Sequence, residues 1–150
     1  DARAGRFGDA HGVLRTLDAI PRDGWWLGFM CVAAQACVEA GDETRAAAVV
    51  ELLAPYGSSW GAFGWAATWG PVGLWLAELC GLLGRVDDAR GWIEGIDASG
   101  SRAWALRARY VRARVGLEPS GTLAAVARDA RALGMKLLAT QANRARTPVA

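Results

Sequence analysis

The sequence predicts an all-α protein in which antiparallel helical hairpins stack into a short right-handed superhelix. Three observations support this fold class. The 150 residues, of which 53% are hydrophobic and 21% charged, are enough for a single domain with a substantial core. One pattern of glycine, alanine and aliphatic residues recurs along the chain at helical spacing. No run of residues alternates with a period of two, so we expect no β-strand.

The recurring pattern has a glycine, an alanine five residues later, and aliphatic residues nine and twelve residues later. Its three copies are Gly5, Ala10, Leu14 and Leu17; Gly41, Ala46, Val50 and Leu53; and Gly84, Ala89, Ile93 and Ile96. The alanine and the aliphatic residues share one helical face, and each glycine is expected to end the preceding helix in the left-handed conformation. The intervals of 36 and 43 residues predict tetratricopeptide-like hairpins, the longer interval containing an insertion.

This register divides the chain into successive units of one helical-repeat domain. They are a partial repeat at 1–19, a repeat at 24–54, an aromatic, glycine-rich insertion at 55–70, a repeat at 71–97, a degenerate repeat at 99–133, an extra helix at 135–145 and a tail at 146–150. Asp42 and Ser120 are expected helix N-caps, and Pro71 is expected in a helix first turn. Because neither end carries a polar cap, we expect a piece of a longer array or ends that something else covers.

The insertion and the residues after it concentrate aromatic side chains among glycines. They are Trp60, Phe63, Trp65, Trp69 and Trp75. One hypothesis is that these rings pack as core between the second and third hairpins. The other is that they line or cover a concave groove and bind a peptide or an apolar effector.

Positive charge is concentrated in the last third of the chain. Residues 1–100 have a net charge of −6 and residues 101–150 a net charge of +8. Arg107 and Arg114 are expected on one flank of a helix, and Arg109 and Arg112 on the other, beside a buried stripe that contains Trp104. These arginines form either a solvated face or a binding surface for a nucleotide, a nucleic acid or an acidic partner, nucleic acid being the less expected.

The sequence lacks the motifs of the common reaction centres. The only lysine, Lys136, is not in a phosphate-binding loop, and the only histidine, His11, is expected to be a surface or packing residue. We therefore predict no catalytic residue, no metal, no cofactor and no enzymatic activity in this segment. The apolar stretch at 60–83 is interrupted by glycines and a proline, so we expect no membrane span.

Cysteines and paired carboxylates have structural interpretations. Three cysteines, an odd number, occur without a signal peptide, which favours a reduced, cytoplasmic setting. They are expected to be small apolar core residues: Cys31, Cys37 and Cys80. The acidic pairs, Asp42 with Glu43 and Asp87 with Asp88, are expected to complement the positive ends of helices.

The whole chain resembles the C-terminal helical-repeat region of large bacterial regulatory ATPases. These are adenylate or guanylate cyclase-like ATPases and helix-turn-helix transcriptional regulators. The stretches that carry the resemblance are Trp25–Tyr56, Trp69–Arg90, Trp104–Gly116 and Ala127–Ala139. The resemblance implies a sensing or docking module whose ATPase and output domains lie elsewhere in a longer polypeptide.

These observations together predict a non-catalytic protein-interaction or sensor module with a concave helical surface. Its expected partners are a protein segment or other domains of the same polypeptide, and its uncapped ends permit self-association. The alternative is a domain that binds a small-molecule effector in an apolar aromatic pocket under the insertion at 55–70.

Overall fold

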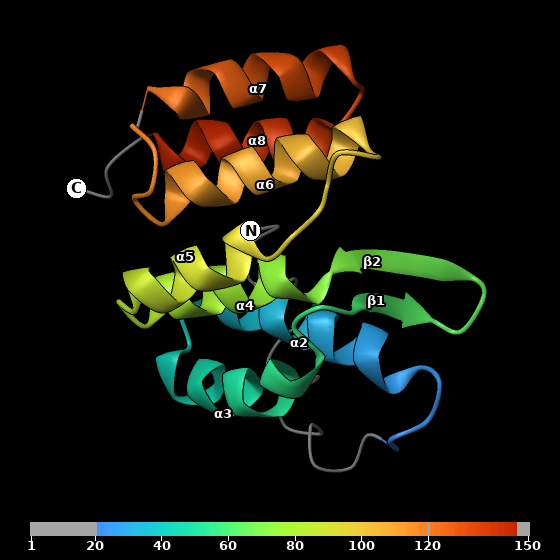
Figure 1. The fold of residues 1–150 in the computed structure, drawn as a ribbon. Helices are drawn as coiled ribbons and strands as arrows, with labels where there is room; N and C mark the ends of the chain where they lie inside the picture. Colours follow the sequence, from blue (N-terminus) through green and yellow to red (C-terminus); the bar gives the residue numbers. More distant parts are fainter. Residues whose placement is uncertain (1–20, 120, 147–150) are drawn as a thin grey trace, which may run out of the picture.

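The structure, a computed structural model, describes residues 21–119 and 121–146 (Figure 1). The first copy of the glycine pattern, His11 and Ser120 lie outside these residues. The elements are α2 (Trp26–Ala40), α3 (Glu43–Leu53), a short 3₁₀ helix (Ala54–Tyr56), β1 (Trp60–Phe63), β2 (Ala67–Pro71), α4 (Val72–Leu82), α5 (Val86–Glu94), α6 (Arg102–Arg114), α7 (Thr122–Ala132) and α8 (Lys136–Ala145). The chain is therefore mainly helical, as predicted.

Left-handed glycines end the helices where the sequence pattern places them. Gly41 has φ 68° and Gly84 has φ 72°. After Gly41, the Asp42 N–H donates a hydrogen bond to the Cys37 carbonyl at 3.0 Å, which closes the end of α2. This arrangement gives a hydrogen-bond donor to carbonyls of the last turn, which have no N–H partner within the helix. It also turns the chain into the next helix. Asp42 is the predicted N-cap of α3, and its side chain accepts a hydrogen bond from the Arg45 N–H.

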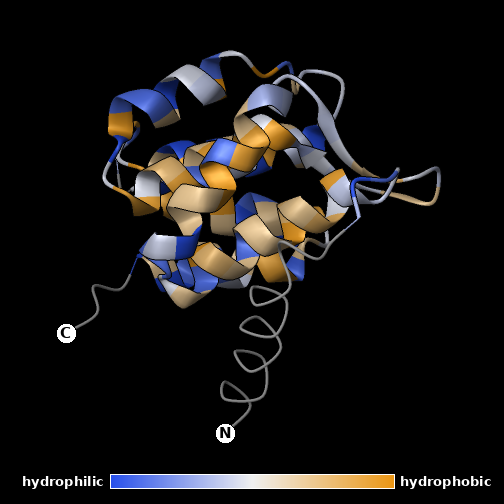
Figure 2. Ribbon diagram, turned by 90° about the horizontal axis from the view of Figure 1, so that it is seen from below, coloured by the Kyte–Doolittle hydropathy of each residue, from blue (hydrophilic) through white to orange (hydrophobic). Residues whose placement is uncertain are grey.

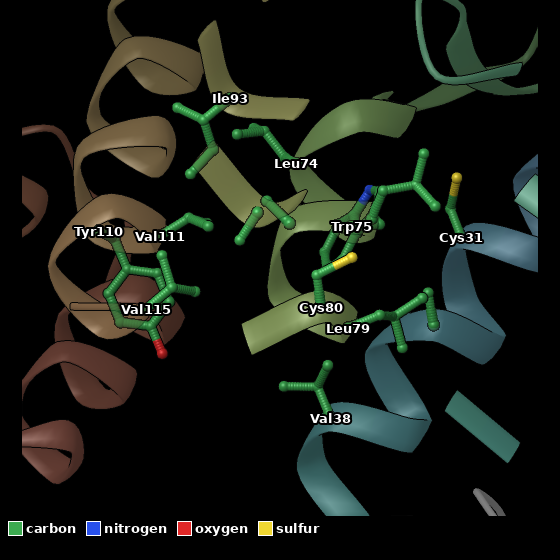
Figure 3. Close-up of a cluster of buried hydrophobic side chains, with 14 of the residues drawn as sticks. Cys31, Val38, Leu74, Trp75, Leu79, Cys80, Ile93, Tyr110, Val111 and Val115 are labelled. Atoms are coloured by element: carbon green, nitrogen blue, oxygen red, sulfur yellow. The ribbon is translucent and has the colours of Figure 1, made fainter. Parts of the chain in front are cut away.

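Helix α4 lies at the centre of the molecule. It packs against α2, α3, α5 and α6. All of the residues from Val72 to Cys80 are buried, and apart from Glu78 they are apolar on every side of the helix. In Figure 3, Leu74, Trp75, Leu79 and Cys80 of α4 lie between Tyr110, Val111 and Val115 of α6 and Cys31 and Val38 of α2. Figure 2 shows hydrophobic residues gathered where the helices face one another.

The β1–β2 hairpin corrects the expectation that the chain has no strand. The strands are antiparallel, and the hairpin extends beyond the helices (Figure 1). Its backbone packs directly on α2, since a side chain at Gly61 would collide with Cys31 and one at Gly28 with the Ala62 carbonyl. Bare backbone in this contact replaces the alternating apolar side chains that normally signal a strand. The hairpin occupies most of the predicted insertion.

Two predicted helix starts also shift. Pro71 is the last residue of β2 and the N-cap of α4, with an extended backbone, and so it lies just before the first turn. The first helix of the degenerate repeat expected at 99–133 begins at Arg102, where the Ser101 hydroxyl accepts a hydrogen bond from the Trp104 N–H at 3.4 Å. The extra helix predicted after Gly134 is α8, which packs against α7 and contacts α6.

Candidate functional site

The candidate site is a pocket of about 400 Å³ at the point where β2, α2, α4, α6 and α8 meet. Its lining residues are Gln35, Thr68, Trp69, Trp75, Trp104, Arg107, Met135, Lys136, Leu137, Leu138 and Gln141. A volume of this order holds one small organic molecule. The walls are mostly aromatic and aliphatic, with a few polar groups among them.

A bulge in the hairpin places Trp69 at the pocket. Gly61 pairs with Gly70 and Ala62 pairs with Thr68, so Trp69 is left without a partner on β1. The Thr68 hydroxyl bridges the gap, because it donates to the Gly61 carbonyl at 3.0 Å and accepts from the Gly70 N–H at 3.1 Å. Bulges of this kind redirect a side chain out of the regular alternation.

Two further contacts fix the aromatic walls. The Trp75 indole N–H donates to the Trp69 carbonyl at 2.9 Å, so the buried ring of α4 holds the bulged residue of β2. Gly70 has φ 88°, and a Cβ at this position would overlap the ring of Trp104. Only a glycine gives both the left-handed backbone and the space for that ring. The three indoles therefore converge on one pocket from β2, α4 and α6.

Arg107 contributes a charged group that is almost fully buried. Its exposed fraction is 8%, and its guanidinium donates to Glu78 of α4 and, from Nη1, to Gln141 Oε1 of α8 at 2.8 Å. The guanidinium carbon also lies 4.9 Å from the ring centre of Trp75 and 5.1 Å from that of Tyr110. Charge pairing and cation–π contacts together compensate the loss of water around this cation.

Two of the lining residues hold buried donors without an acceptor. They are the indole Nε1 of Trp69 and the Nε of Arg107, neither of which has a hydrogen-bond partner among the residues that the structure covers. A buried donor left unpaired costs about 1–3 kcal/mol. Unpaired donors of this kind are uncommon in folded proteins and call for a specific explanation.

The first turn of α8 forms another part of the pocket wall. Met135, Lys136, Leu137 and Leu138 all line it, and the N-terminus of α8 has no side-chain cap and no acidic residue in its first turn. The free N–H groups and the dipole at such a helix end favour negative charge. With Arg107 and Lys136, the lining contains two cations and no acid.

The structure divides the predicted aromatic site. Trp69 and Trp75 line the pocket, whereas Trp60 and Trp65 do not. Trp65 is 98% exposed, and Trp60 contacts the pocket only indirectly, through an edge-on ring contact with Trp104 at 5.9 Å. Phe63 packs edge-on against Trp69 at 5.9 Å. Neither hypothesis for the insertion therefore describes all five rings.

The predicted row of arginines is also divided. Arg107 is buried, which corrects the expectation of a solvated face at this residue, because Glu78 provides the countercharge inside the protein. The side chain of Arg109 is 45% exposed, and its Nη1 lies 3.6 Å from Oδ2 of Asp129 in α7. Arg114 donates to the Tyr110 hydroxyl at 2.9 Å. Arg112 belongs to the same helix and does not line the pocket, so Arg107 is the single member of the row that does.

Several residues that line the pocket were not predicted from the sequence. Trp104 was expected only as part of a buried stripe, and Gln35, Lys136 and Gln141 were given no role in a site. One signal was present: Glu78 is the lone charge in the apolar stretch from 60 to 83. A buried acid of this kind needs a cationic partner, which is Arg107.

The cysteines have the structural role that the sequence predicts. All three are buried. Burial raises the pKa of the Cys31 thiol to about 12 and that of Cys37 to about 11, and it also raises the pKa of Cys80. Thiols with such pKa values are weak nucleophiles at neutral pH. Glu43, Asp87 and Asp88 stand in the first turns of α3 and α5, as expected.

Within residues 21–119 and 121–146, no group of three or more His, Cys, Asp or Glu side chains is placed to hold a metal ion. In the same ranges, no helix has the length and apolarity needed to cross a membrane.

Comparison of the chain with protein-family models, with curated proteins and with solved structures gave no match. The resemblance to the regulatory ATPases therefore stays a prediction.

Proposed function

We propose that this chain is a non-catalytic sensor module that binds a small aromatic effector in the pocket. The observation that carries the proposal is the convergence of three indoles on a space of about 400 Å³ whose lining contains two buried donors without acceptors. Aromatic walls supply contact area for a flat ligand, and a few fixed polar groups orient it. This is the second of the two functions that the sequence indicates, and its pocket lies beside the hairpin.

The lining residues favour binding over catalysis. They supply indoles, amides, a guanidinium, an ammonium group and the Thr68 hydroxyl, whose hydrogen bonds go to the hairpin backbone, and none is a histidine, cysteine or carboxylate. The carboxylate of Glu78 is engaged by Arg107, a residue of the lining. A ligand in this pocket is held and released without a change in its bonds.

The pocket is lined by elements from separate parts of the chain, so a bound ligand contacts all of them. Gln35, Trp69 and Trp75 line it from α2, β2 and α4, while Trp104 and Gln141 line it from α6 and α8. A ligand that touches both groups of elements favours the arrangement in which they are close together. Occupation of the pocket is thereby linked to the packing of α6 on α4 and of α8 on α6.

We further propose that the helices form the tetratricopeptide-like stack predicted from the sequence. In support, α2, α4, α6 and α8 each pack on the next in this order. The second helix of each hairpin also packs on the first helix of the following one, since α3 contacts α4 and α5 contacts α6. Placement in a signalling or transcription-regulating ATPase rests on the sequence resemblance alone.

The protein-interaction role is the alternative proposal, and a different surface favours it. Trp65 at the hairpin tip is 98% exposed, and Trp25 and Phe29 beside the hairpin are also exposed. Exposed aromatic side chains that lie close together are typical of protein-binding surfaces. Trp65→Ser abolishes docking under this proposal and leaves binding in the pocket unchanged.

Calorimetric titration with three two-ring compounds tests the sensor proposal. The probes are 2-naphthoate, 2-naphthamide and 2-(aminomethyl)naphthalene. At least one is expected to bind saturably at one site per chain, and Gln35→Phe, which fills the pocket, is expected to weaken it at least tenfold. Thr44→Phe on the exposed face of α3 is the matched control and leaves binding unchanged. Absence of binding by all three probes, or equal binding to Gln35→Phe, contradicts the proposal.

A further inference from the structure

We propose that the effector is an aromatic carboxylate, with its ring among Trp69, Trp75 and Trp104 and its carboxylate at the first turn of α8. This inference rests on the proposed sensor function and adds the chemical class of the ligand. Four features of the pocket support it.

The net charge of the pocket is the first feature. Arg107 is neutralised from behind by Glu78, which does not line the pocket itself. Lys136 lines the pocket, and no ion pair joins its ammonium group to a carboxylate of the described chain. One positive charge at the wall is therefore uncompensated. A ligand with a single negative charge balances it, and a cationic ligand is repelled.

The polarity of the unpaired groups is the second feature. Trp69 Nε1 and Arg107 Nε are both donors, and both belong to residues of the lining. An ionised carboxylate only accepts hydrogen bonds, whereas an ammonium group only donates them. The polarity of these unpaired groups therefore favours a ligand rich in acceptors over one rich in donors.

The N-terminus of α8 is the third feature. This helix has ten residues, and its first turn lies in the pocket wall without a side-chain cap. The backbone N–H of Lys136 donates to the Gly134 carbonyl at 3.0 Å, and the dipole of the helix favours an anion in this region of the pocket. Lys136 is the first residue of the helix, so the two sources of positive potential coincide.

The distribution of apolar surface is the fourth feature. The three indoles form the side of the pocket made by β2, α4 and α6, and the cation and the helix start are on the side made by α8. A ligand with a flat ring at one end and an anion at the other matches this division. The pocket volume of about 400 Å³ accommodates one or two fused rings with a carboxylate.

The test compares the three probes of the previous titration, which share a ring system and differ in charge. At low salt, 2-naphthoate is expected to bind at least tenfold more tightly than 2-naphthamide, and 2-(aminomethyl)naphthalene more weakly than both. Lys136→Gln is expected to reduce the preference for the carboxylate to threefold or less, with the affinity for 2-naphthamide unchanged. Arg90→Gln, which removes an exposed charge of α5 outside the pocket, is the matched control and preserves the preference.

The possible outcomes separate this inference from the sensor function. If 2-naphthamide or the amine binds as tightly as 2-naphthoate, the ligand class is wrong and the sensor function stands. If the preference persists in Lys136→Gln, the carboxylate does not lie at α8 and the inference is overturned. If no probe binds, both proposals are wrong. Circular dichroism of the two variants establishes that they are folded, which is expected because both side chains are exposed.

Discussion

Arg107 of α6 pairs with Glu78 of α4 at a place where both side chains are almost fully buried. Their exposed fractions are 8% and 4%. Gln141 of α8 accepts a second hydrogen bond from the same guanidinium, so one cation joins three helices beside the pocket. Removing two charges from water costs free energy. The ion pair fixes the relative positions of these helices at the candidate site.

Removal of one member of this pair is expected to destabilise the protein strongly. Glu78→Ala leaves the guanidinium of Arg107 buried without its countercharge, which costs about 3–5 kcal/mol. Replacement of both residues, as Glu78→Leu with Arg107→Met, is expected to cost less than Glu78→Ala alone. Urea unfolding of the unsubstituted protein and of both variants measures these losses. Arg109→Ala breaks a partly exposed pair with Asp129 and is the control, at about 0–1 kcal/mol. An equal loss in Glu78→Ala and Arg109→Ala contradicts the prediction.

Gly70→Ala is expected to destabilise the hairpin and displace a wall of the pocket. The backbone at Gly70 has φ 88°, and the added Cβ overlaps the ring of Trp104. Strained backbone of this kind costs about 1–3 kcal/mol, before any cost of moving the ring. Urea unfolding gives the free-energy change. Gly100→Ala, which adds a Cβ in open space, is the matched control. A loss no larger than that of the control shows that the ring moves aside freely.

The helices were predictable because their signals are local. The stripe that contains Ala46, Val50 and Leu53 is complete within three turns, and Gly41 marks the preceding helix end on its own. Hydrophobic periodicity and helix-end chemistry depend only on neighbouring residues. The predicted repeats at 24–54 and 71–97 therefore each contain a pair of helices in the structure, α2 with α3 and α4 with α5.

The hairpin and the pocket were not predictable in the same way. Arg107 meets Glu78 across 29 residues of sequence and Gln141 across 34, so its burial depends on how whole helices pack. The strands depend on a backbone contact between Gly61 and Cys31 of α2, which no alternation in the sequence reports. Trp69 and Trp75 were identified as candidate site residues because they lie in or just after an aromatic, glycine-rich insertion. Their partner Trp104 was interpreted as core.

The stability of the protein is expected to fall above pH 9 because of its buried thiols. Burial raises the pKa of Cys31 from 9.0 to about 12 and that of Cys37 to about 11. The contribution is present below pH 9 and is lost as the pH rises towards these values, since only the unfolded state releases the protons. From pH 9 to pH 10 the two thiols together lower the free energy of unfolding by about 2 kcal/mol. Urea unfolding at both pH values measures the loss, and a Cys31→Ala, Cys37→Ala variant is expected to lack this component. An identical pH dependence in that variant contradicts the assignment.

Two tryptophan substitutions are expected to differ because the two indole N–H groups differ in their partners. Trp69→Phe removes a buried donor that has no acceptor, and this gain offsets part of the lost ring contact. Trp75→Phe removes the N–H that donates to the Trp69 carbonyl at 2.9 Å and leaves this carbonyl without the bond. We therefore expect Trp75→Phe to be less stable than Trp69→Phe by about 1–3 kcal/mol in urea unfolding. Equal losses contradict the distinction between the two rings.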